Sequence, residues 1–472
     1  MENTASRETV VTCKTHEGVE VRATILRLTR YLASFEIYDP TSMLQASEVL
    51  DEFKILLNGR LVYDGRAVVS NLVNAGTVLI CEATLQESWI DIQTASLENK
   101  AYLRAEFGEF MRQWEKNYKV LPDFKVVVAD MQSMLADMRL WLGQVELGVM
   151  SHPPERRAQL EHDVIQELSG PILPSLGMLF EKFEESCRAI EPDLKPAHRA
   201  YVQRQLHPLV LASPFMNRTF QKPLGYAGDY EMVAMMMRDP QEGASLFAKS
   251  LNTFFLNTPP VVAHVNRIEY LKTILVQETA RVVRAGRVAK IFNLGCGPAK
   301  EIQDFIAMSD LSGKAHFTLL DFNPETLQST GANLTGLINK YHRATQLQMV
   351  KKSVAQVLKE AGKATSTVLS SGYDLVYCAG LFDYMPEFVC QQLMAMFYRM
   401  LAPGGLLVAT NVHTSNPSRG WMELCVDWHL IYRDNRQMVK LVPEAAPADS
   451  HTVLSEPTGV NTFVEIRKPD HV

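Results

Sequence analysis

The sequence lacks the features that would assign it at once to membrane or nucleic-acid-binding proteins. It has no run of about 18 apolar residues, the length that a membrane-spanning helix requires. Its beginning, MENTASRETV, is polar, so we expect no signal peptide. It also has no basic surplus, because 47 Lys and Arg stand against 53 Asp and Glu and the net charge is −6. We therefore expect no membrane span and no nucleic-acid partner.

The seven cysteines lack the spacing of a metal or redox centre. They are scattered, with no C-x-x-C pair and no histidine at metal-ligand spacing. We expect reduced thiols, no metal site and a cytoplasmic location. At 472 residues, the chain is long enough for roughly two to four domains.

The stretch AKIFNLGCGPAKEIQ, at 289–303, is the clearest functional signal. Its apolar run predicts a buried strand that ends in Gly295-Cys296-Gly297-Pro298 and leads into a helix beginning near Ala299. Glycines have no Cβ, so the backbone can bend sharply there and lie against a ligand, while the start of the helix offers unpaired N–H groups.

Two cofactor classes use such a turn. A dinucleotide fold requires G-x-G-x-x-G, because the third glycine lets the helix pack close to the pyrophosphate site, but this chain has Lys300 there. The next predicted strand, 316–320, is followed by Asp321, whose carboxylate can accept hydrogen bonds from ribose hydroxyls. The pattern favours a nucleoside without pyrophosphate.

These motifs, A-K-I-F-N-L-G-C-G-P and T-L-L-D-F-N, resemble the cofactor-binding half of class I S-adenosylmethionine-dependent methyltransferases. In that family an Asp or Glu usually stands where this chain has Asn293. The resemblance implies S-adenosyl-L-methionine as the cofactor. It assigns cofactor contacts to Asn293, Gly295, Cys296, Gly297, Asp321, Phe322, Ser353, Val354, Ala379 and Gly380.

Strands and helices alternate over the whole carboxyl-terminal part. Strands are predicted at 290–294, 316–320, 346–350, 373–378 and 405–410, the last after the turn L-A-P-G-G. Two more, at 438–441 and 461–467, would form an antiparallel closing pair, with a loop between them. We predict an α/β, Rossmann-like core with a parallel, doubly wound sheet over 289–472.

The first 87 residues predict a small β-barrel of short, alternating strands, two of them at 60–63 and 66–73, with a hairpin turn at Asn58-Gly59. This part resembles the PilZ family, whose cyclic-dinucleotide binders carry an R-x-x-x-R arm and a D/N-x-S-x-x-G turn. Here Val73 replaces the serine, and Arg27 and Arg30 have a different spacing. A structural barrel, or one that docks a partner protein or a second copy of the chain, is the favoured interpretation.

Residues 88–213 change to helical periodicity. We predict three or four helices, broken at Pro122, at Pro153-Pro154 and at Pro171 and Pro174. A methionine-rich stripe at 131–138 has two interpretations, ordinary helix packing or a surface for lipid.

Residues 214–288 contain KPLGYAGDY, at 222–230, before a helix that Asp229 would cap. One interpretation is a plain loop and N-cap. The other is an active-site lid, with Tyr226 catalytic and Asp229 and Tyr230 near the cofactor. The motif resembles a stretch of bacterial proteins of 3-hydroxy fatty acid methyl ester synthesis. A helix at 261–283 should then lead into the core.

The segment after the fifth strand, 411–433, is the predicted acceptor region. A helix from Asn416-Pro417-Ser418 would align Arg419, Glu423 and Asp427 on one face and Trp421, Cys425, Trp428 and Tyr432 on another. The charged face has two interpretations. It is either an ion-paired surface stripe or an acceptor site in which Arg419 or Arg433 orients a carboxylate. His413 is the candidate general base or orienting donor, and Arg419 and Glu423 are further catalytic candidates.

The expected reaction follows from these motifs and their resemblance. We expect methyl transfer from S-adenosylmethionine to a small or lipid-like acceptor, such as the carboxylate of a 3-hydroxy fatty acid, which needs no base because it is already ionised near neutral pH. Two alternatives stay open: N- or C-methylation of a metabolite or protein, and a regulatory protein that binds the cofactor without transferring methyl.

Overall fold

The computed structural model describes residues 9–15, 18–37, 44–57, 60–74, 79–86, 89, 104, 107–108, 111–112, 119–361 and 371–470. The chain forms two compact units, each built from separate stretches of sequence. The first holds 1–227, 239–257 and 417–429, and the second holds 228–238, 258–416 and 430–472. The KPLGYAGDY motif is therefore shared between the units, and its first six residues belong to the first.

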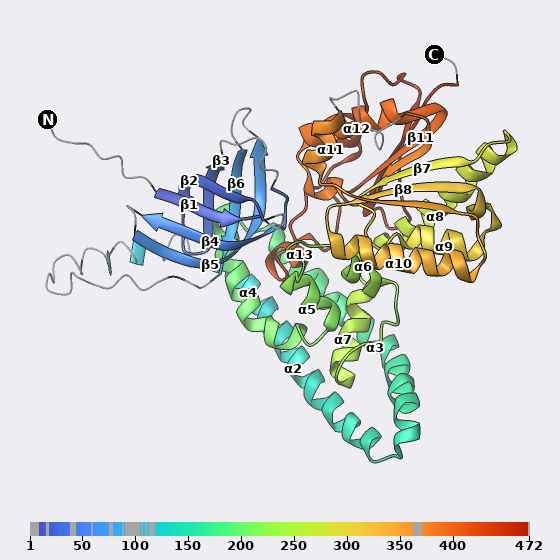
Figure 1. Ribbon diagram of the computed structural model, residues 1–472. Coiled ribbons are helices and arrows are strands. Elements are labelled where there is room, and N and C mark those ends of the chain that lie inside the picture. Colours follow the sequence, from blue (N-terminus) through green and yellow to red (C-terminus); the bar gives the residue numbers. More distant parts are fainter. Residues whose placement is uncertain are drawn as a thin grey trace, which may run out of the picture. The chain divides into compact units, whose positions relative to one another are not determined.

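The first unit begins with the predicted barrel, closed in the order β1-β2-β3-β6-β5-β4 (Figure 1). Neighbouring strands are antiparallel, and alternate residues such as Phe35, Phe53 and Tyr63 are buried inside. The strands are β1 (Thr9–Lys14), β2 (Glu20–Leu28), β3 (Leu32–Ile37), β4 (Val49–Leu57), β5 (Arg60–Asn74) and β6 (Leu79–Leu85).

The barrel differs from the expectation in one strand. Residues 60–63 and 66–73, expected as two strands, form the single strand β5. Leu57 pairs with Arg60, as a two-residue hairpin requires, but the predicted turn residues Asn58 and Gly59 lie outside the described residues. Val73 is exposed on β5, and Arg27 is engaged with Asp193 at 2.9 Å.

The other elements described in the first unit are helices. They are α2 (Pro122–Met150), α3 (Pro154–Arg188), η1 (Pro192–Leu194), α4 (Lys195–Val210), α5 (Pro214–Gln221), α7 (Leu246–Leu256) and α13 (Arg419–Leu424). Helices α2 and α3 begin at the predicted prolines. The predicted breaks at Pro171 and Pro174 are wrong, because both lie inside α3. Buried Ile165, Leu176 and Phe183 lie on both sides of the two prolines and pack the helix as one piece.

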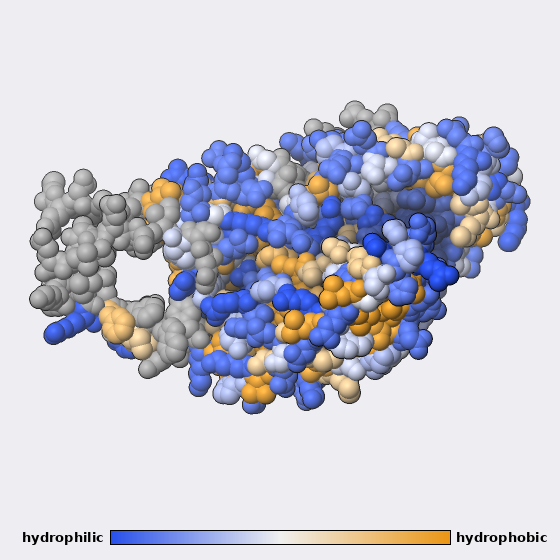
Figure 2. Space-filling view, turned by 90° about the horizontal axis from the view of Figure 1, so that it is seen from below, coloured by the Kyte–Doolittle hydropathy of each residue, from blue (hydrophilic) through white to orange (hydrophobic). Residues whose placement is uncertain are grey.

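The methionine-rich stripe is core: Met131, Leu135 and Met138 are buried on α2, as the helix-packing interpretation predicts. The opposite side exposes Leu140, Trp141 and Leu147. Helices α2 and α3 form a hairpin (Figure 1), and Figure 2 shows apolar residues, in orange, among hydrophilic ones on the face of the molecule that it draws. Within the part of the chain that the structure describes, we find no helix with the length and apolar character that crossing a membrane requires.

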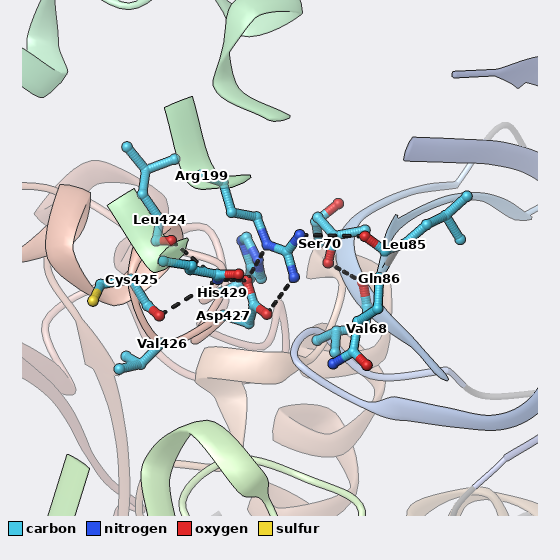
Figure 3. Close-up of polar contacts among 12 residues, drawn as sticks. Val68, Ser70, Leu85, Gln86, Arg199, Leu424, Cys425, Val426, Asp427 and His429 are labelled. Atoms are coloured by element: carbon cyan, nitrogen blue, oxygen red, sulfur yellow. Dashed lines mark hydrogen bonds and ion pairs between the residues drawn. The ribbon is translucent and has the colours of Figure 1, made fainter. Parts of the chain in front are cut away.

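Residues 417–429 are held in the first unit by a buried ion pair. The guanidinium of Arg199 on α4 binds the carboxylate of Asp427 through two nitrogens, with Nη2 at 2.6 Å from Oδ2 (Figure 3). Its Nη1 donates to the carbonyl of Leu85 at the end of β6 (3.3 Å). Arg199 therefore joins the barrel, α4 and the 417–429 segment in one polar network.

The helix predicted from 416 through 432 is wrong because Asp427 in this segment is bound by Arg199. Helix α13 spans only six residues and ends at Leu424. Asp427 has a φ of 52°, in the left-handed region, and cannot continue a helix. The contact with Arg199 outweighs the helical pattern of the sequence. The aromatic side chain of Trp421 nevertheless packs as predicted, stacked on Phe255 with ring centroids 5.5 Å apart.

The second unit is the predicted α/β core, a seven-stranded sheet in the order β12-β13-β11-β10-β7-β8-β9 (Figure 1). Five strands are parallel, and β13 and β12 are antiparallel at one edge. This is the expected α/β core with an antiparallel edge. The strands are β7 (Ala289–Leu294), β8 (Ala315–Asp321), β9 (Gln346–Lys351), β10 (Tyr373–Cys378), β11 (Leu401–Val412), β12 (His451–Ser455) and β13 (Asn461–Arg467).

Helices cover both faces of this sheet. On one face α8, α9 and α10 pack against inward residues such as Ile291, Phe317 and Leu375. On the other, α12 places Phe397 against Phe292, with ring centroids 6.1 Å apart. The elements are α6 (Tyr230–Met236), α8 (Pro259–Arg284), α9 (Lys300–Met308), η2 (Asp310–Lys314), α10 (Pro324–Lys340), α11 (Val354–Ala361), η3 (Phe382–Tyr384), α12 (Glu387–Met400) and α14 (Asn435–Val439).

The predicted closing strand at 438–441 is wrong. Asp434 and Gln437 form a capping box, in which each side chain bonds the other's backbone N–H, and this starts the helix α14. The partner of β13 is instead β12, which lies in the piece expected to be a loop.

Candidate functional site

The glycine turn lies at the carboxyl end of β7. Gly295 and Gly297 have φ values of 72° and 49°, which side-chain-bearing residues rarely adopt. The backbone N–H groups of Gly295 and Cys296 both donate to the carbonyl of Leu320, at 2.8 and 3.1 Å. The turn is thereby fixed to the end of β8, the neighbouring parallel strand.

Asp321 meets this turn directly. Its Oδ2 accepts from the backbone N–H of Gly297 (3.2 Å), and its Oδ1 accepts from that of Asn323 (3.0 Å). Burial raises the pKa of Asp321 to about 6, although these N–H groups favour the carboxylate. The two motifs singled out in the sequence therefore form one site. The carboxylate of Asp321, a hydrogen-bond acceptor, lies there at the end of β8.

One side of this turn is open. A Cβ added at Gly297 would have no described atom within 4 Å, whereas one at Gly295 would meet Leu381 at 3.5 Å. The carbonyl of Gly297 is fixed from the other side by Thr330 Oγ1 on α10, at 2.7 Å. A flat group can lie against Gly297 without displacing protein.

Ser353 and Val354, the candidates for the adenine, directly follow a residue that bonds to Asp321. The backbone N–H of Lys352 donates to the carbonyl of Asp321 at 3.0 Å, which brings the start of α11 to the end of β8. Ser353 is buried, and its Oγ accepts from the N–H of Gln356. The residues expected around a base and those expected around a ribose are therefore neighbours.

Asn293, at the end of β7, is buried and leaves an acceptor unused. Its Oδ1 has no hydrogen-bond partner among the described residues. A buried amide oxygen without a partner costs free energy, which a donor on a ligand would recover. Sequence reasoning missed two neighbouring groups, Tyr377 on β10 and Glu301 on α9, whose side chains bond at 2.7 Å. All six residues of β10 are buried, so its sequence can mark Tyr377 as a core residue but cannot pair it with Glu301.

Ala379 and Gly380 follow β10, the strand beside β7. The N–H of Gly380 donates to Thr410 Oγ1 on β11 at 2.9 Å, and its φ is 86°. Leu381, next in the chain, is the residue that approaches Gly295. The ends of β7, β8 and β10 thus contribute to one region, where ligands bind in open α/β sheets.

Asp229 caps α6, as predicted, by accepting from the N–H of Met232 (2.8 Å). Tyr230 donates its hydroxyl hydrogen to Glu325 Oε1 (2.8 Å) in the first turn of α10, the helix that follows Asp321. This end of the KPLGYAGDY motif therefore belongs to the same unit as the glycine turn. Tyr226 belongs to the other unit.

His413 follows β11, and hydrogen bonds to Ser415 indicate its tautomer. Its Nδ1 lies 3.1 Å from the backbone N of Ser415, whose N–H can only donate. Nδ1 is therefore the accepting nitrogen, and Nε2 carries the ring proton. In this form His413 is a hydrogen-bond donor rather than a base.

The candidate arginines have other partners. Arg433 is buried and donates to the carbonyls of Phe382 and Met385 and to Asn411 Oδ1, so it holds the segment after β10 against β11. Arg419 and Glu423 lie in the first unit and pair at 2.6 Å, as an ion-paired stripe predicts, but Glu423 and Asp427 are buried, so the expected surface position of the stripe is wrong. Lys195 binds the other oxygen of Glu423 at 2.9 Å.

Comparisons with known proteins concern the fold alone. No protein-family model matches the chain, and none of the curated proteins does. A structure described as a possible exported protein from Bordetella parapertussis is 19% identical, covering 60% of this chain and 100% of its own, with a TM-score of 0.42. Magnesium protoporphyrin IX methyltransferase from Synechocystis, with bound S-adenosylhomocysteine, is 10% identical over 44% of this chain and 85% of its own (TM-score 0.31). The S-adenosylmethionine-dependent methyltransferase SibL is 14% identical over 71% and 99% (TM-score 0.33).

Proposed function

We propose that this protein is an S-adenosylmethionine-dependent methyltransferase. The observation that carries the proposal is the bond between the Gly297 N–H and the Asp321 carboxylate, beside an open face of the glycine turn. A carboxylate there can accept from ribose hydroxyls, and a Cβ-free backbone can lie against the nucleoside. The orphaned Oδ1 of Asn293 offers an acceptor for the ammonium of the methionyl part.

The residues of the second unit divide the cofactor between them in this proposal. Asp321 would bind the ribose, Ser353 and Val354 would flank the adenine, and Asn293 and Gly380 would lie at the methionyl end. When bound, S-adenosylmethionine supplies an electrophilic methyl group. The protein then has to align the acceptor with that group, a task that can lower a barrier by about 7–11 kcal/mol.

A carboxylate is the acceptor that suits His413 best. A donor at Nε2 can orient an ionised carboxylate but cannot take a proton from an amine or alcohol. We therefore propose O-methylation of an organic acid, in particular a 3-hydroxy fatty acid, the acceptor that the KPLGYAGDY resemblance implies. Tyr226, Arg419 and Glu423 stay candidate residues for the acceptor side.

Two experiments test this proposal in sequence. Calorimetry should detect binding of S-adenosylmethionine and S-adenosylhomocysteine to the intact chain. Labelled methyl should then pass to a medium-chain 3-hydroxy acid, and mild base should release the label as an ester would. Base-stable label would refute O-methylation of a carboxylate and favour N- or C-methylation. Binding without transfer to any extract would favour the regulatory alternative.

A matched pair of variants tests the role of His413. His413→Asn removes the Nε2 donor and should raise the KM for the acid about tenfold, while leaving S-adenosylhomocysteine affinity unchanged. His342→Asn is the control, because His342 is exposed and its φ of 52° suits asparagine. Equal kinetics for the two variants would remove His413 from the acceptor site.

For the amino-terminal barrel, we propose a structural or protein-docking role. Val73 and Arg27 lack the arrangement that a cyclic dinucleotide needs, and Arg27 already pairs with Asp193. Addition of a cyclic dinucleotide should therefore give no heat of binding, and a measurable affinity would overturn this role.

A further inference from the structure

Arg267 on α8 is a buried cation that is only half used. Only 6% of the surface of Arg267 is exposed. Nη2 bonds to Nε2 of His264, one turn earlier on the same helix, but Nη1 has no hydrogen-bond partner in the described parts of the chain. A buried guanidinium with an unused N–H group is costly, so the fold has a reason outside its own stability to keep it.

No carboxylate of the described residues pairs directly with the Nη1 of this cation. Burial and the adjacent Arg267 lower the pKa of His264 well below its usual value, so His264 is a neutral acceptor. Asp383, Tyr384, Glu301 and Cys378 act on Arg267 from a distance, Asp383 most strongly. Yet Asp383 Oδ1 accepts from the N–H of Val412 (2.6 Å), and Glu301 accepts from Tyr377. Neither carboxylate hydrogen-bonds to Arg267, so among the described residues Nη1 is left for a ligand.

The guanidinium lies at the end of β10. A Cβ added at Gly380 would fall 3.0 Å from Nη1 and 3.2 Å from Nη2, so the absence of a side chain there is what admits Arg267. The next residue, Leu381, is the one that approaches Gly295. Nη1 is therefore placed beside the methionyl end of the proposed cofactor site and beside the strand ends where an acceptor would be methylated.

We propose that Nη1 of Arg267 binds a carboxylate in this region. The inference rests on the proposed function, which supplies two carboxylates: that of the methionyl part of the cofactor and that of an organic acid acceptor. A carboxylate suits the site because a guanidinium presents directed N–H donors and stays charged when buried. The sequence pattern predicts the helix at 261–283 that carries Arg267, but no role for this residue.

The first experiment asks whether the cofactor provides the carboxylate. Calorimetry on the intact chain compares S-adenosylhomocysteine with its decarboxylated analogue, which keeps the amine. If the cofactor is the source, the wild type binds S-adenosylhomocysteine at least about tenfold more tightly than the analogue, and Arg267→Met removes this preference. Arg267→Lys keeps the positive charge without the directed N–H groups of a guanidinium, and it should retain part of the preference for S-adenosylhomocysteine. Arg284→Met, an exposed cation on α8, is the control and should leave it unchanged.

The second experiment asks whether the acceptor provides it. A medium-chain 3-hydroxy acid and its methyl ester are titrated into the protein saturated with S-adenosylhomocysteine. If the acceptor is the source, the wild type prefers the acid at least about tenfold and Arg267→Met does not. Thermal melting of each variant separates lost contacts from lost folding.

The inference is overturned if the wild type discriminates neither pair of ligands, a result that needs no variant. It is also overturned if folded Arg267→Met keeps both preferences within twofold of the wild type. Failure of the proposed function looks different, because then the wild type binds neither S-adenosylhomocysteine nor its analogue.

Discussion

Protonation of Asp321 should control cofactor affinity. Burial raises its pKa from 3.8 to about 6, so the carboxylate that would accept from ribose hydroxyls is lost as the pH falls through about 6 rather than about 4. With a pKa of 6, about 99% of Asp321 is ionised at pH 8 and about 9% at pH 5. Affinity for S-adenosylhomocysteine should therefore fall about tenfold between these pH values.

Through Asp321, pH affects the stability of the ligand-free protein with the opposite sign to its effect on cofactor affinity. An acid whose folded pKa exceeds its unfolded pKa binds a proton more readily in the folded state. In the ligand-free protein, the stabilising contribution of protonated Asp321 is thus present below about pH 4 and is lost as the pH rises through about 6. Ligand binding and ligand-free stability should move in opposite directions in this window as far as Asp321 is concerned.

The assay is calorimetry with S-adenosylhomocysteine at half-unit steps from pH 5 to 8, at constant ionic strength. Asp321→Asn is measured alongside and should bind weakly with a flat profile. This variant is needed because burial also raises the pKa of Asp383 to about 6. Constant wild-type affinity down to pH 5, or an unchanged slope in Asp321→Asn, would refute the assignment of the ribose to Asp321.

Three further predictions concern the turn, the buried ion pair and the capping box. Gly297→Trp should fill the open side of the turn and lower S-adenosylhomocysteine affinity at least about 100-fold, whereas Gly297→Ala should mainly cost about 1–2 kcal/mol of stability from its left-handed φ; equal affinities would contradict this. Asp427→Asn should destabilise the first unit by about 3–5 kcal/mol in urea unfolding, because it leaves Arg199 buried without its anion; less than about 1 kcal/mol would refute a buried pair. The pKa of Asp427 is lowered to about 2, so its contribution should be lost as the pH falls from about 4 to 2. Asp434→Ala should cost about 1 kcal/mol through loss of the cap on α14, and no change in melting temperature would show that the cap is dispensable.

Much of the fold could be predicted where local pattern and tertiary contacts agree. The apolar run before Gly295 became β7, and β10 and β13 have the predicted bounds. Pro171 and Pro174 failed as breaks because packing on both sides of them holds α3 together. The helix expected after Pro417 ended early because Asp427 is drawn to Arg199, a partner 228 positions away in the sequence.

The candidate site could likewise be predicted only where local sequence pattern determines which residues meet. Gly297 and Asp321 could be predicted because short motifs at strand ends place them together. The role of Arg267 could not be predicted. It depends on the unused Nη1 and on the missing Cβ of Gly380, and the helical periodicity of the sequence around Arg267 shows neither. Arg433 has the residue type of a carboxylate clamp, but its buried environment gives it three oxygen partners within the fold.

A crystal structure of the chain soaked with S-adenosylhomocysteine tests the central claim most directly. The account predicts the ribose hydroxyls within about 2.5–3.0 Å of the Asp321 carboxylate and the nucleoside against the open side of Gly297. A nucleoside bound elsewhere, or a ribose turned away from Asp321, would contradict it.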